Sequence, residues 1–427
     1  MNFFRKHSLF LVFTAGVLIR IGVMFLDYSF DVNNHIVWAK DLWQRGPVNF
    51  YDTPSSEVYA THYPNYPPVS LLFFSLAFPV QKIAVAAAWW LNIHIPLFPS
   101  NLMFPLQERF FLAAMMKLPA ILADFGLAVV LYQFARRIVP KQKNAPILAI
   151  SSVLLNPVFF YNSAFWGQID SIPLFFSFVS FYILLFLKKP TASVIFFVVA
   201  ILVKPTALVF FPLYLVLHIR SFGFRKSLAS FLFGAVIFVI SFLPFLKSFY
   251  NFGDIYHIFI DRILAAQSLP YVTNGAFNFW LILTQFRGIK DTVPFLFGAP
   301  YYVIGYVMAA FFIVLMLWKM IKVKDTKVSL LMGTFFSSFA AFLFLTKMHE
   351  RYLILILPSL LLLSLKYRRL TPWFIILSFS GFLNLYHSWP VPRISMLSSL
   401  LDYPLIYSSI SASNVFAFAY LFKKFLK

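Results

Sequence analysis

Long apolar stretches separated by short clusters of lysine and arginine run through nearly the whole sequence, and this pattern restricts what the chain can fold into. A helix needs about 20 consecutive apolar residues to cross a bilayer, and Leu9–Leu26 is the first stretch of that kind. Hydrophobic residues make up 61% of the 427 residues and charged residues only 11%. A soluble domain cannot bury that much apolar surface. We therefore expect an all-α, polytopic integral membrane protein with one domain over residues 1–427.

The positive charge of the chain lies mostly between the apolar stretches. The net charge is +21, and clusters of this kind mark cytoplasmic loops in membrane proteins. The clusters are Arg136–Lys143, Lys188–Lys189, Arg220–Lys226, Lys319–Lys327, Lys366–Arg369 and Lys423–Lys427. No nucleic-acid-binding motif accompanies them, so we expect no nucleic-acid partner. The chain has no cysteine, which excludes disulfides and thiolate chemistry.

Placing the basic clusters on the cytoplasmic side predicts about twelve membrane segments with both termini in the cytoplasm. Residues 27–109 then form a large first extracytoplasmic loop, and residues 250–298 form a second one. Within the first loop, Val69–Trp90 is long enough to span, but a span there would place the basic cluster after Phe110–Ala135 outside. We therefore expect Val69–Trp90 to form interfacial or re-entrant helices. In a prokaryote, the membrane would be the plasma membrane.

The first part of this loop, residues 27–68, is the most polar stretch between apolar segments. Asp31, His35 and Trp38 are four and seven residues apart, so they share one face of a helix. A carboxylate at the membrane surface could act as a general base on an acceptor hydroxyl. Two plainer interpretations stay open: Asp31 caps a helix over Val32–Trp43, or the stretch is a solvated connector.

Other polar residues are predicted to face the same side. Trp166, Gln168 and Asp170 lie in a short turn whose amide and aromatic groups suit a hydroxyl-rich ligand, although Asp170 could equally cap a helix. The triplet His349, Glu350 and Arg351 forms the densest charged outer turn. Arginine binds phosphate oxygens through a planar fork, and the alternative is an interfacial anchor.

Two charged residues fall inside predicted membrane segments. Lys204 precedes Pro205 in Thr191–Leu217, which we expect to form a hairpin of two short helices. Lys204 would contact a phosphate or pair with Asp124 or Asp170. Asp124 lies in the middle of a span, where a carboxylate needs a partner or a proton. We expect that partner to be Lys117, Lys204 or a tyrosine.

The order of these features over residues 9–365 resembles the GT-C superfamily of membrane glycosyltransferases. The Asp31–Trp38 spacing, Tyr66-Pro67-Pro68 and His349-Glu350 are similar to the Alg-type dolichyl-phosphate-glucose glucosyltransferases. The added Arg351-Tyr352 and the Trp166–Asp170 turn look more like the GPI-mannosyltransferase-like group. Asn65 stands where the Alg-type segment has a second Asp, so no role is carried over for that carboxylate.

The resemblance implies a GT-C-like fold and an inverting transfer of one hexose, glucose or mannose. The donor would be a polyprenyl-phosphate sugar, and the acceptor an extracytoplasmic glycolipid, lipid-linked oligosaccharide or polymer. Asp31 would be the general base, and the phosphate would be bound by Lys204, His349 and Arg351. The substrate contacts would be His35, Trp38, Tyr66, Trp166, Gln168, Asp170 and Glu350.

We expect a monomer with no tightly bound cofactor or metal, although a GT-C donor of this kind leaves Mg²⁺ or Mn²⁺ as an alternative. The sequence has no metalloprotease, Walker or nucleophile-elbow motif. Two other functions stay open. One is a lipid-linked saccharide transporter or flippase, which should carry paired charges along a transmembrane path. The other is a non-catalytic assembly subunit, which would tolerate replacement of Asp31 by Asn.

Overall fold

A computed structural model describes residues 2–58, 61–248, 251–266 and 269–426 of the chain. The regular structure in them is almost entirely helical, as a lipid environment requires, because a helix satisfies its backbone groups internally. Nine helical stretches among these residues are long and apolar enough to cross a membrane. They are His7–Met24, Pro68–His94, Arg109–Ile138, Ala145–Trp166, Pro205–Phe222, Phe224–Phe245, Tyr301–Lys322, Thr326–Phe344 and Pro404–Leu426. The protein is therefore an all-α, polytopic integral membrane protein; the figure of about twelve segments and the orientation of the termini stay predictions.

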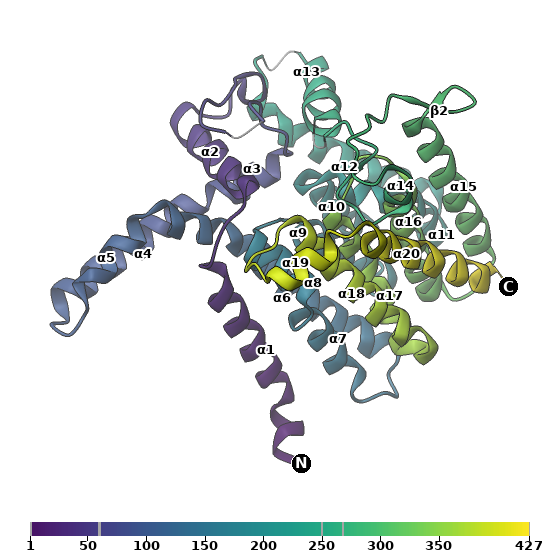
Figure 1. Ribbon diagram of the computed structural model, residues 1–427, viewed down its shortest axis with the longest axis horizontal. Coiled ribbons are helices and arrows are strands. Elements are labelled where there is room, and N and C mark those ends of the chain that lie inside the picture. Colours follow the sequence, from purple (N-terminus) through teal and green to yellow (C-terminus); the bar gives the residue numbers. More distant parts are fainter. Residues whose placement is uncertain (1, 59–60, 249–250, 267–268, 427) are drawn as a thin grey trace.

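The helices are numbered in chain order (Figure 1). They are α1 (Asn2–Met24), α2 (Phe30–Arg45), α3 (Pro68–Ser75), α4 (Ala77–His94), α5 (Met103–Gln107), α6 (Arg109–Ile138), α7 (Ala145–Leu154), α8 (Pro157–Phe160), α9 (Ser171–Tyr182), α10 (Pro190–Val203), α11 (Phe211–Phe222), α12 (Phe224–Phe242), α13 (Gly253–His257), α14 (Phe279–Thr284), α15 (Tyr301–Lys322), α16 (Thr326–Phe344), α17 (Leu357–Lys366), α18 (Thr371–Ser388), α19 (Ser395–Leu401) and α20 (Pro404–Leu426).

Short 3₁₀ and π turns and four small strands complete the described structure. The turns used below are η1 (Phe50–Asp52), η3 (Tyr161–Trp166), η5 (Pro205–Phe210), η7 (Ile258–Ala265), η8 (Glu350–Ile356) and η9 (Arg368–Leu370). The strands are β1 (Thr273–Asn274), β2 (Pro294–Leu296), β3 (Ala299–Pro300) and β4 (Met348–His349). Strand β1 pairs in parallel with β4, and β2 pairs antiparallel with β3.

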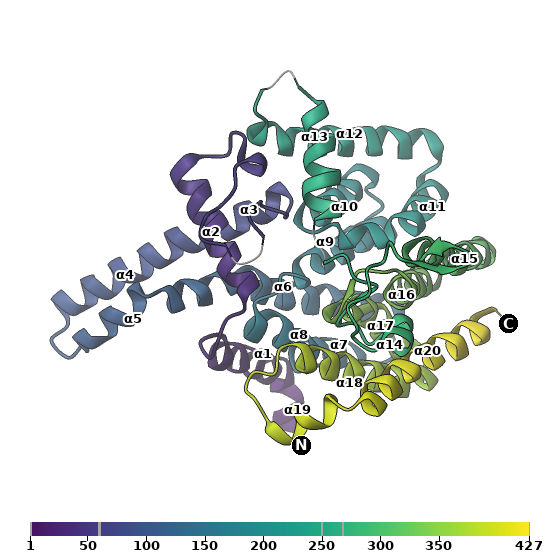
Figure 2. The same cartoon turned by 45° about the horizontal axis from the view of Figure 1, so that its top comes forward.

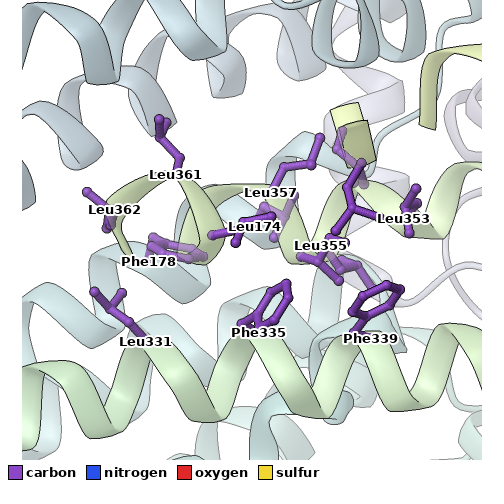
Figure 3. Packing of buried hydrophobic residues seen from close by; sticks show 14 of the residues in the cluster. Leu174, Phe178, Leu331, Phe335, Phe339, Leu353, Leu355, Leu357, Leu361 and Leu362 are labelled. Atoms are coloured by element: carbon purple, nitrogen blue, oxygen red, sulfur yellow. The ribbon is translucent and has the colours of Figure 1, made fainter. Parts of the chain in front are cut away.

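Helix α16 lies at the centre of the bundle, and its side chains are buried on every face. Figure 3 shows Phe335 and Phe339 of α16 facing Leu355 of η8, with Phe178 of α9 nearer Leu331 of α16. A helix that is apolar all round belongs in the interior of a helical assembly. Because lipid tails are as apolar as these side chains, close packing rather than exclusion from water holds the bundle together. This packing fixes η8, and with it the charged turn at its start.

Helix α1 is fastened to α6 by an ion pair inside the bundle. Arg20 Nη2 lies 2.8 Å from Asp124 Oδ2, and the two side chains are 1% and 0% exposed. Arg20 also donates to the carbonyl oxygen of Leu154, and Ser163 donates to Asp124 at 2.6 Å. The predicted partners of Asp124 were therefore wrong. Lys117 instead donates to the carbonyls of Met24 and Asp27, where α1 ends.

Helices α4 and α5 form an arm that projects sideways from the bundle, across the direction of α1 (Figures 1 and 2). The arm exposes large apolar side chains, including Ile83, Trp89, Trp90 and Phe104. A hairpin that crosses the direction of the spanning helices fits the expected interfacial segment better than a full span, although Pro68–His94 is long enough for one. Its position relative to the bilayer stays a prediction.

The connections that carry the polar residues gather at one end of the molecule. Figure 1 shows α2, α13 and β2 at this end, and the N-terminus of α1 at the other. The expected break at Lys204 is confirmed, because α10 ends at Val203 and η5 and α11 follow it. The second part is longer than expected, since Pro205–Phe222 is long enough to span. Lys204 itself has an extended backbone between the two, so its side chain can turn toward the polar end.

Candidate active site

Five polar side chains from distant parts of the sequence meet where α2, η3, α10 and η8 approach one another. Gln168 Nε2 donates to Asp31 Oδ2. Lys204 Nζ lies 2.6 Å from Asp170 Oδ1. Arg351 Nε lies 3.6 Å from the other oxygen of that carboxylate. The predicted residues of the first loop, the Trp166–Asp170 turn, the helix break and the late charged turn are therefore brought together.

Asp31 lies in the first turn of α2, and it is not the cap of that helix. Ser29 is the N-cap, and its hydroxyl accepts a hydrogen bond from the amide of Val32. The capping interpretation of Asp31 is therefore wrong, and the helix begins two residues earlier than the expected Val32. The carboxylate of Asp31 is thus left to face the cavity that it lines.

The charge state of Asp31 is set by opposing effects. Burial raises the pKa of Asp31, but the positive charge of Arg351 and the hydrogen bond from Gln168 bring it below the ordinary value of an aspartate. A lowered pKa keeps the carboxylate ionised at neutral pH. It can therefore accept a proton, as a general base must.

An aromatic wall stands behind Asp31, built from α2, α3 and the Tyr-Pro-Pro elbow. The ring of His35 stacks on Phe74 with a centroid distance of 4.0 Å, and it packs edge-to-face with Tyr66 at a centroid distance of 5.1 Å. Trp38 and Tyr66 have centroids 6.0 Å apart. His35 Nε2 and Trp38 Nε1 are buried with no hydrogen-bond partner among the described residues. Burial lowers the pKa of His35 to about 3, although Asp31 opposes this, so the imidazole is neutral at ordinary pH.

The predicted shared face of α2 is confirmed by the cavity it borders. Asp31, His35 and Trp38 all line a polar cavity of about 550 Å³, a size within the range of small-molecule sites, about 300–1,000 Å³. Tyr66, His349 and Arg351 line it too. We name this space the Asp31 cavity. A carboxylate and a guanidinium therefore face one volume.

A second cavity of about 510 Å³ lies on the other side of the His349–Arg351 turn. Trp166, Glu350 and His387 line it, and it shares His349 and Arg351 with the Asp31 cavity. We name it the Glu350 cavity. The ring of His387 stacks on Phe286 with a centroid distance of 5.1 Å. Arg351 thus stands between two polar spaces, with its guanidinium carbon 5.8 Å from the Trp166 ring centroid.

The charged turn is held in place by a glycine in the second outer loop. Gly275 has φ of +81°, and a Cβ there would lie 3.1 Å from Glu350 Oε2. Asn384 of α18 donates to the Gly275 carbonyl at 2.7 Å, and β1 pairs with β4 beside it. Glu350 in turn lies 2.6 Å from Arg351 Nη1. The left-handed backbone and this close contact both favour glycine here, so the backbone of Gly275 lies directly against Glu350, the partner of Arg351.

The ionisation of the turn follows from its ion pairs. Burial raises the pKa of Glu350, but Arg351 and His349 outweigh burial and bring it to about 2. Burial and the charge of Arg351 lower the pKa of His349. Glu350 is therefore a fixed anion at neutral pH, and its pairing with Arg351 makes it a support for that cation rather than a second proton acceptor.

Three predicted contact residues do not line either cavity. Gln168, Asp170 and Lys204 lie behind them, and Lys204 and Asp170 are 0% exposed. Gln168 acts on Asp31, and Asp170 bridges Lys204 and Arg351. These three residues therefore orient Asp31 and Arg351, which line the cavities. Direct contact of Lys204 with a phosphate stays a prediction.

Four residues that shape the site were not predicted from the sequence. Arg262 pairs with Asp52 at 2.9 Å and covers the Tyr63 ring, 4.0 Å from its centroid, at the wall of the Asp31 cavity. Gly275, His387 and Asn384 surround Glu350. For Arg262 and Gly275 the only sequence signal was the predicted outer position of residues 250–298. His387 and Asn384 belong to α18 and had no sequence signal, since each acts through long-range contacts.

An apolar groove of about 470 Å³ begins beside the cations and runs between η5, α15, α16 and η8. Tyr352, Met348, Leu264 and Phe342 are among its lining residues. Lys204 Nζ lies 5.2 Å from the Tyr352 ring centroid, and Arg351 Cζ lies 5.6 Å from it. The groove thus leads from the apolar part of the bundle to the positively charged turn.

In the part of the chain that the structure describes, no group of three or more histidine or acidic side chains could hold a metal ion. The expected independence from a tightly bound metal stays a prediction, because an ion could also be held by the substrate. No family model matches the chain, and no curated protein matches it in a sequence search. The GT-C resemblance therefore stays a prediction, and the chemistry of the site has to come from its own residues.

Proposed function

We propose that the protein is a membrane glycosyltransferase of GT-C type that uses a polyprenyl-phosphate sugar. The observation that carries the proposal is the sharing of one polar cavity by an ionised carboxylate, Asp31, and a buried guanidinium, Arg351, beside an apolar groove that Tyr352 lines. Transfer from a lipid phosphate needs these three parts: a base for the acceptor, a cation for the leaving phosphate and a place for the lipid.

The reaction balances with these groups. An acceptor hydroxyl in the Asp31 cavity gives its proton to the Asp31 carboxylate. Its oxygen bonds to the anomeric carbon, and the bond from that carbon to the phosphate oxygen breaks with its electron pair on the phosphate. Attack from the face opposite the phosphate inverts the anomeric centre. Arg351, with His349 beside it, stabilises the charge that develops on the phosphate.

The aromatic walls support a saccharide as the ligand. Trp38 and Tyr66 border the Asp31 cavity, and Trp166 borders the Glu350 cavity. Two buried nitrogen atoms of the cavity wall, His35 Nε2 and Trp38 Nε1, have no hydrogen-bond partner among the described residues. Buried polar atoms without partners are costly, so a hydroxyl-rich ligand would satisfy them.

In the proposed orientation, both termini are cytoplasmic and the site is extracytoplasmic. The support is the separation of charge: the outer-loop residues gather at the end of the molecule that carries α2 and α13 (Figure 1), whereas the basic clusters fall in the other connections. The donor sugar is glucose or mannose in this proposal.

The test uses the full-length protein purified in detergent with added lipid. Short-chain polyprenyl-phosphate-glucose and polyprenyl-phosphate-mannose are offered separately with a membrane extract as acceptor, and labelled sugar is followed. Asp31→Asn should lower transfer by at least about 100-fold, since general-base catalysis contributes about 10²–10⁴-fold. Asp41→Asn is the matched control on the same helix, because Asp41 pairs with Arg45 and does not line the cavity. Near-normal transfer by Asp31→Asn would remove Asp31 as the base.

A transporter of lipid-linked saccharides is the second candidate. Two ion pairs inside the bundle, Arg20–Asp124 and Lys204–Asp170, favour it, because transporters carry paired charges within membrane segments. All four side chains are at most 1% exposed, so neither pair lines an open path. Passage of labelled donor across liposome membranes without chemical change would establish the transporter instead.

A further inference from the structure

A third kind of cavity lies at the end of the bundle away from the candidate active site. Helix α17 follows η8, which starts at Glu350 beside the site, and α17 ends at Lys366. The cavity opens around this far end, between α16, α17, α18 and α20, and has a volume of about 290 Å³. It shares no lining residue with the two polar cavities.

The interior of this cavity is apolar and its mouth is positively charged. Phe335, Leu363 and Leu421 line the inside, and Arg369 and Lys424 are the charged residues at its edge. Both cations are exposed. No acidic residue is among the lining residues. The cavity therefore combines an uncharged interior with an uncompensated positive rim.

The two cations at the rim differ from a neighbouring lysine that is paired. Lys366 Nζ lies 2.8 Å from Asp325 Oδ2. Within the described ranges, Arg369 and Lys424 have no acidic partner of that kind, and each only covers a tyrosine ring. Arg369 Cζ lies 6.0 Å from the Tyr367 centroid, and Lys424 Nζ lies 5.8 Å from that of Tyr420. Both charges are thus available to an anion at the mouth.

Aromatic side chains surround the same mouth. Trp373 lines the cavity, and its ring centroid lies 5.3 Å from that of Tyr420. Tryptophan and tyrosine are enriched where a membrane protein meets the headgroup layer. Lys424 and Arg369 belong to basic clusters that follow or precede apolar helices, which places them at the same level. An acyl chain and its headgroup would meet the protein at this boundary.

We propose that this cavity binds an anionic membrane phospholipid. One acyl chain would enter between α16 and α20, and the phosphate would lie against Arg369 and Lys424. A free phosphate ion would leave the apolar interior unfilled, and a zwitterionic lipid would compensate the two cations less well. A volume of about 290 Å³ is at the low end of ligand sites, about 300–1,000 Å³, so it suits one segment of a chain. The bound lipid would join α20 to α17 and α18.

The test measures lipid retention by native mass spectrometry and the thermal unfolding temperature of the full-length protein in detergent. The probes are phosphatidylglycerol, phosphatidylcholine with the same acyl chains, and soluble glycerol phosphate. Phosphatidylglycerol should be retained preferentially and should raise the unfolding temperature, whereas glycerol phosphate should do neither. Arg369→Gln with Lys424→Gln should weaken phosphatidylglycerol retention by about 30-fold, the effect of removing two charges near a headgroup.

A matched pair of substitutions separates a local site from general surface charge. The variant Arg368→Gln with Lys423→Gln also removes two positive charges, each one residue away from the proposed site. Neither residue lines this cavity, so this variant should retain the lipid. Arg369→Lys with Lys424→Arg keeps the charges and should retain it as well. Equal retention of both lipids by the wild-type protein, or equal losses in the two glutamine pairs, would overturn the proposal. If the variant Arg369→Gln with Lys424→Gln fails to fold, the comparison of the two lipids on the wild-type protein still tests the proposal.

Discussion

The side-chain amide of Gln168 donates a hydrogen bond to the carboxylate of Asp31, across 137 positions of sequence. Gln168 is fully buried in the turn after η3, so its position is fixed by the helices around it. The bond orients the carboxylate toward the cavity, and it is one of the effects that hold the pKa of Asp31 below its usual value. The proposed base is thus controlled by a residue that does not line the cavity.

Replacing Gln168 should therefore change the pH dependence of transfer. Gln168→Leu removes a hydrogen bond to the ionised form, so the pKa of Asp31 should rise. The ionised base would then be lost at a higher pH when the solution is acidified. The acid limb of the pH–rate profile should shift upward, and the maximal rate should fall about tenfold as orientation is lost. Steady-state transfer measured over the accessible pH range checks this.

The control for that variant is Gln44→Leu, an exposed glutamine on α2. It should leave both the acid limb and the maximal rate unchanged. A lower rate in Gln168→Leu without any shift of the acid limb would mean that the bond only orients Asp31. An unchanged profile and rate would remove Gln168 from the site.

Local patterns in the sequence predicted the helical membrane class and the shared face of Asp31, His35 and Trp38. Both depend on hydropathy and helical period, which neighbouring residues determine. The break at Lys204 was also predictable, because a proline follows it. These features needed no knowledge of which helices touch.

The contacts between helices were harder to predict from the sequence. Arg20 lies inside an apolar stretch, so it was taken as part of the first span, and its partnership with Asp124 emerged only once α1 and α6 were placed together. Gly275 gives no sign in the sequence that Glu350 will lie 3.1 Å from its missing Cβ. Long-range packing sets both relations, and hydropathy carries no information about it.

Gly275→Ala should damage the site more than the fold. The left-handed backbone there should cost a residue with a Cβ about 1–2 kcal/mol, and the methyl group would also push against Glu350 and Ser388. Displacing Glu350 would move Arg351, so we expect transfer to fall at least about tenfold. Thermal unfolding and transfer are measured on the same preparation.

Gly298→Ala is the matched control for the backbone effect. Gly298 has φ of +78°, and its missing Cβ would meet nothing within 4 Å. This variant should lose similar stability and keep transfer. If the two variants lose transfer equally, the contact of Gly275 with Glu350 does not govern the turn.

The Arg20–Asp124 pair should be essential to the fold. Removing one partner of a buried pair leaves an uncompensated charge and costs about 3–5 kcal/mol, so Asp124→Asn or Arg20→Leu should sharply lower the unfolding temperature and the yield. The double variant Arg20→Met with Asp124→Leu should recover most of the loss, because apolar replacements leave no unpaired charge.

A surface pair provides the comparison for that experiment. Arg45 and Asp41 are four residues apart on α2 with a separation of 3.1 Å, and such helix pairs contribute only about 0.3–0.5 kcal/mol. Asp41 also accepts a hydrogen bond from Ser55, which the side-chain oxygen of an asparagine can still accept, so Asp41→Asn should change the unfolding temperature little. A comparably small effect of Asp124→Asn would contradict the assignment of the buried pair as a fastening of α1.

His257 connects the two outer loops. His257 Nδ1 lies 2.8 Å from Asp261 Oδ2, and His257 Nε2 lies 3.4 Å from Asp52 Oδ1. The hydrogen bond to Asp261, with that to Asp52, raises the pKa of His257 despite partial burial. A raised pKa means that the protonated imidazole stabilises the folded state. Because Asp52 belongs to η1 and also pairs with Arg262, this stabilisation should hold the first loop against η7.

Because the pKa of His257 is raised, the pH range in which it stabilises the folded protein can be stated. The stabilisation should be complete below about pH 6.5, the unperturbed value for histidine, and should disappear as the pH rises through the raised pKa of His257. The unfolding temperature of His257→Gln should therefore fall below that of the wild-type protein in acid and converge with it in alkali. His62→Gln, which changes an exposed histidine with no acidic partner among the described residues, should track the wild type throughout. A gap between wild type and His257→Gln that stays constant with pH would show that the imidazole acts without its proton.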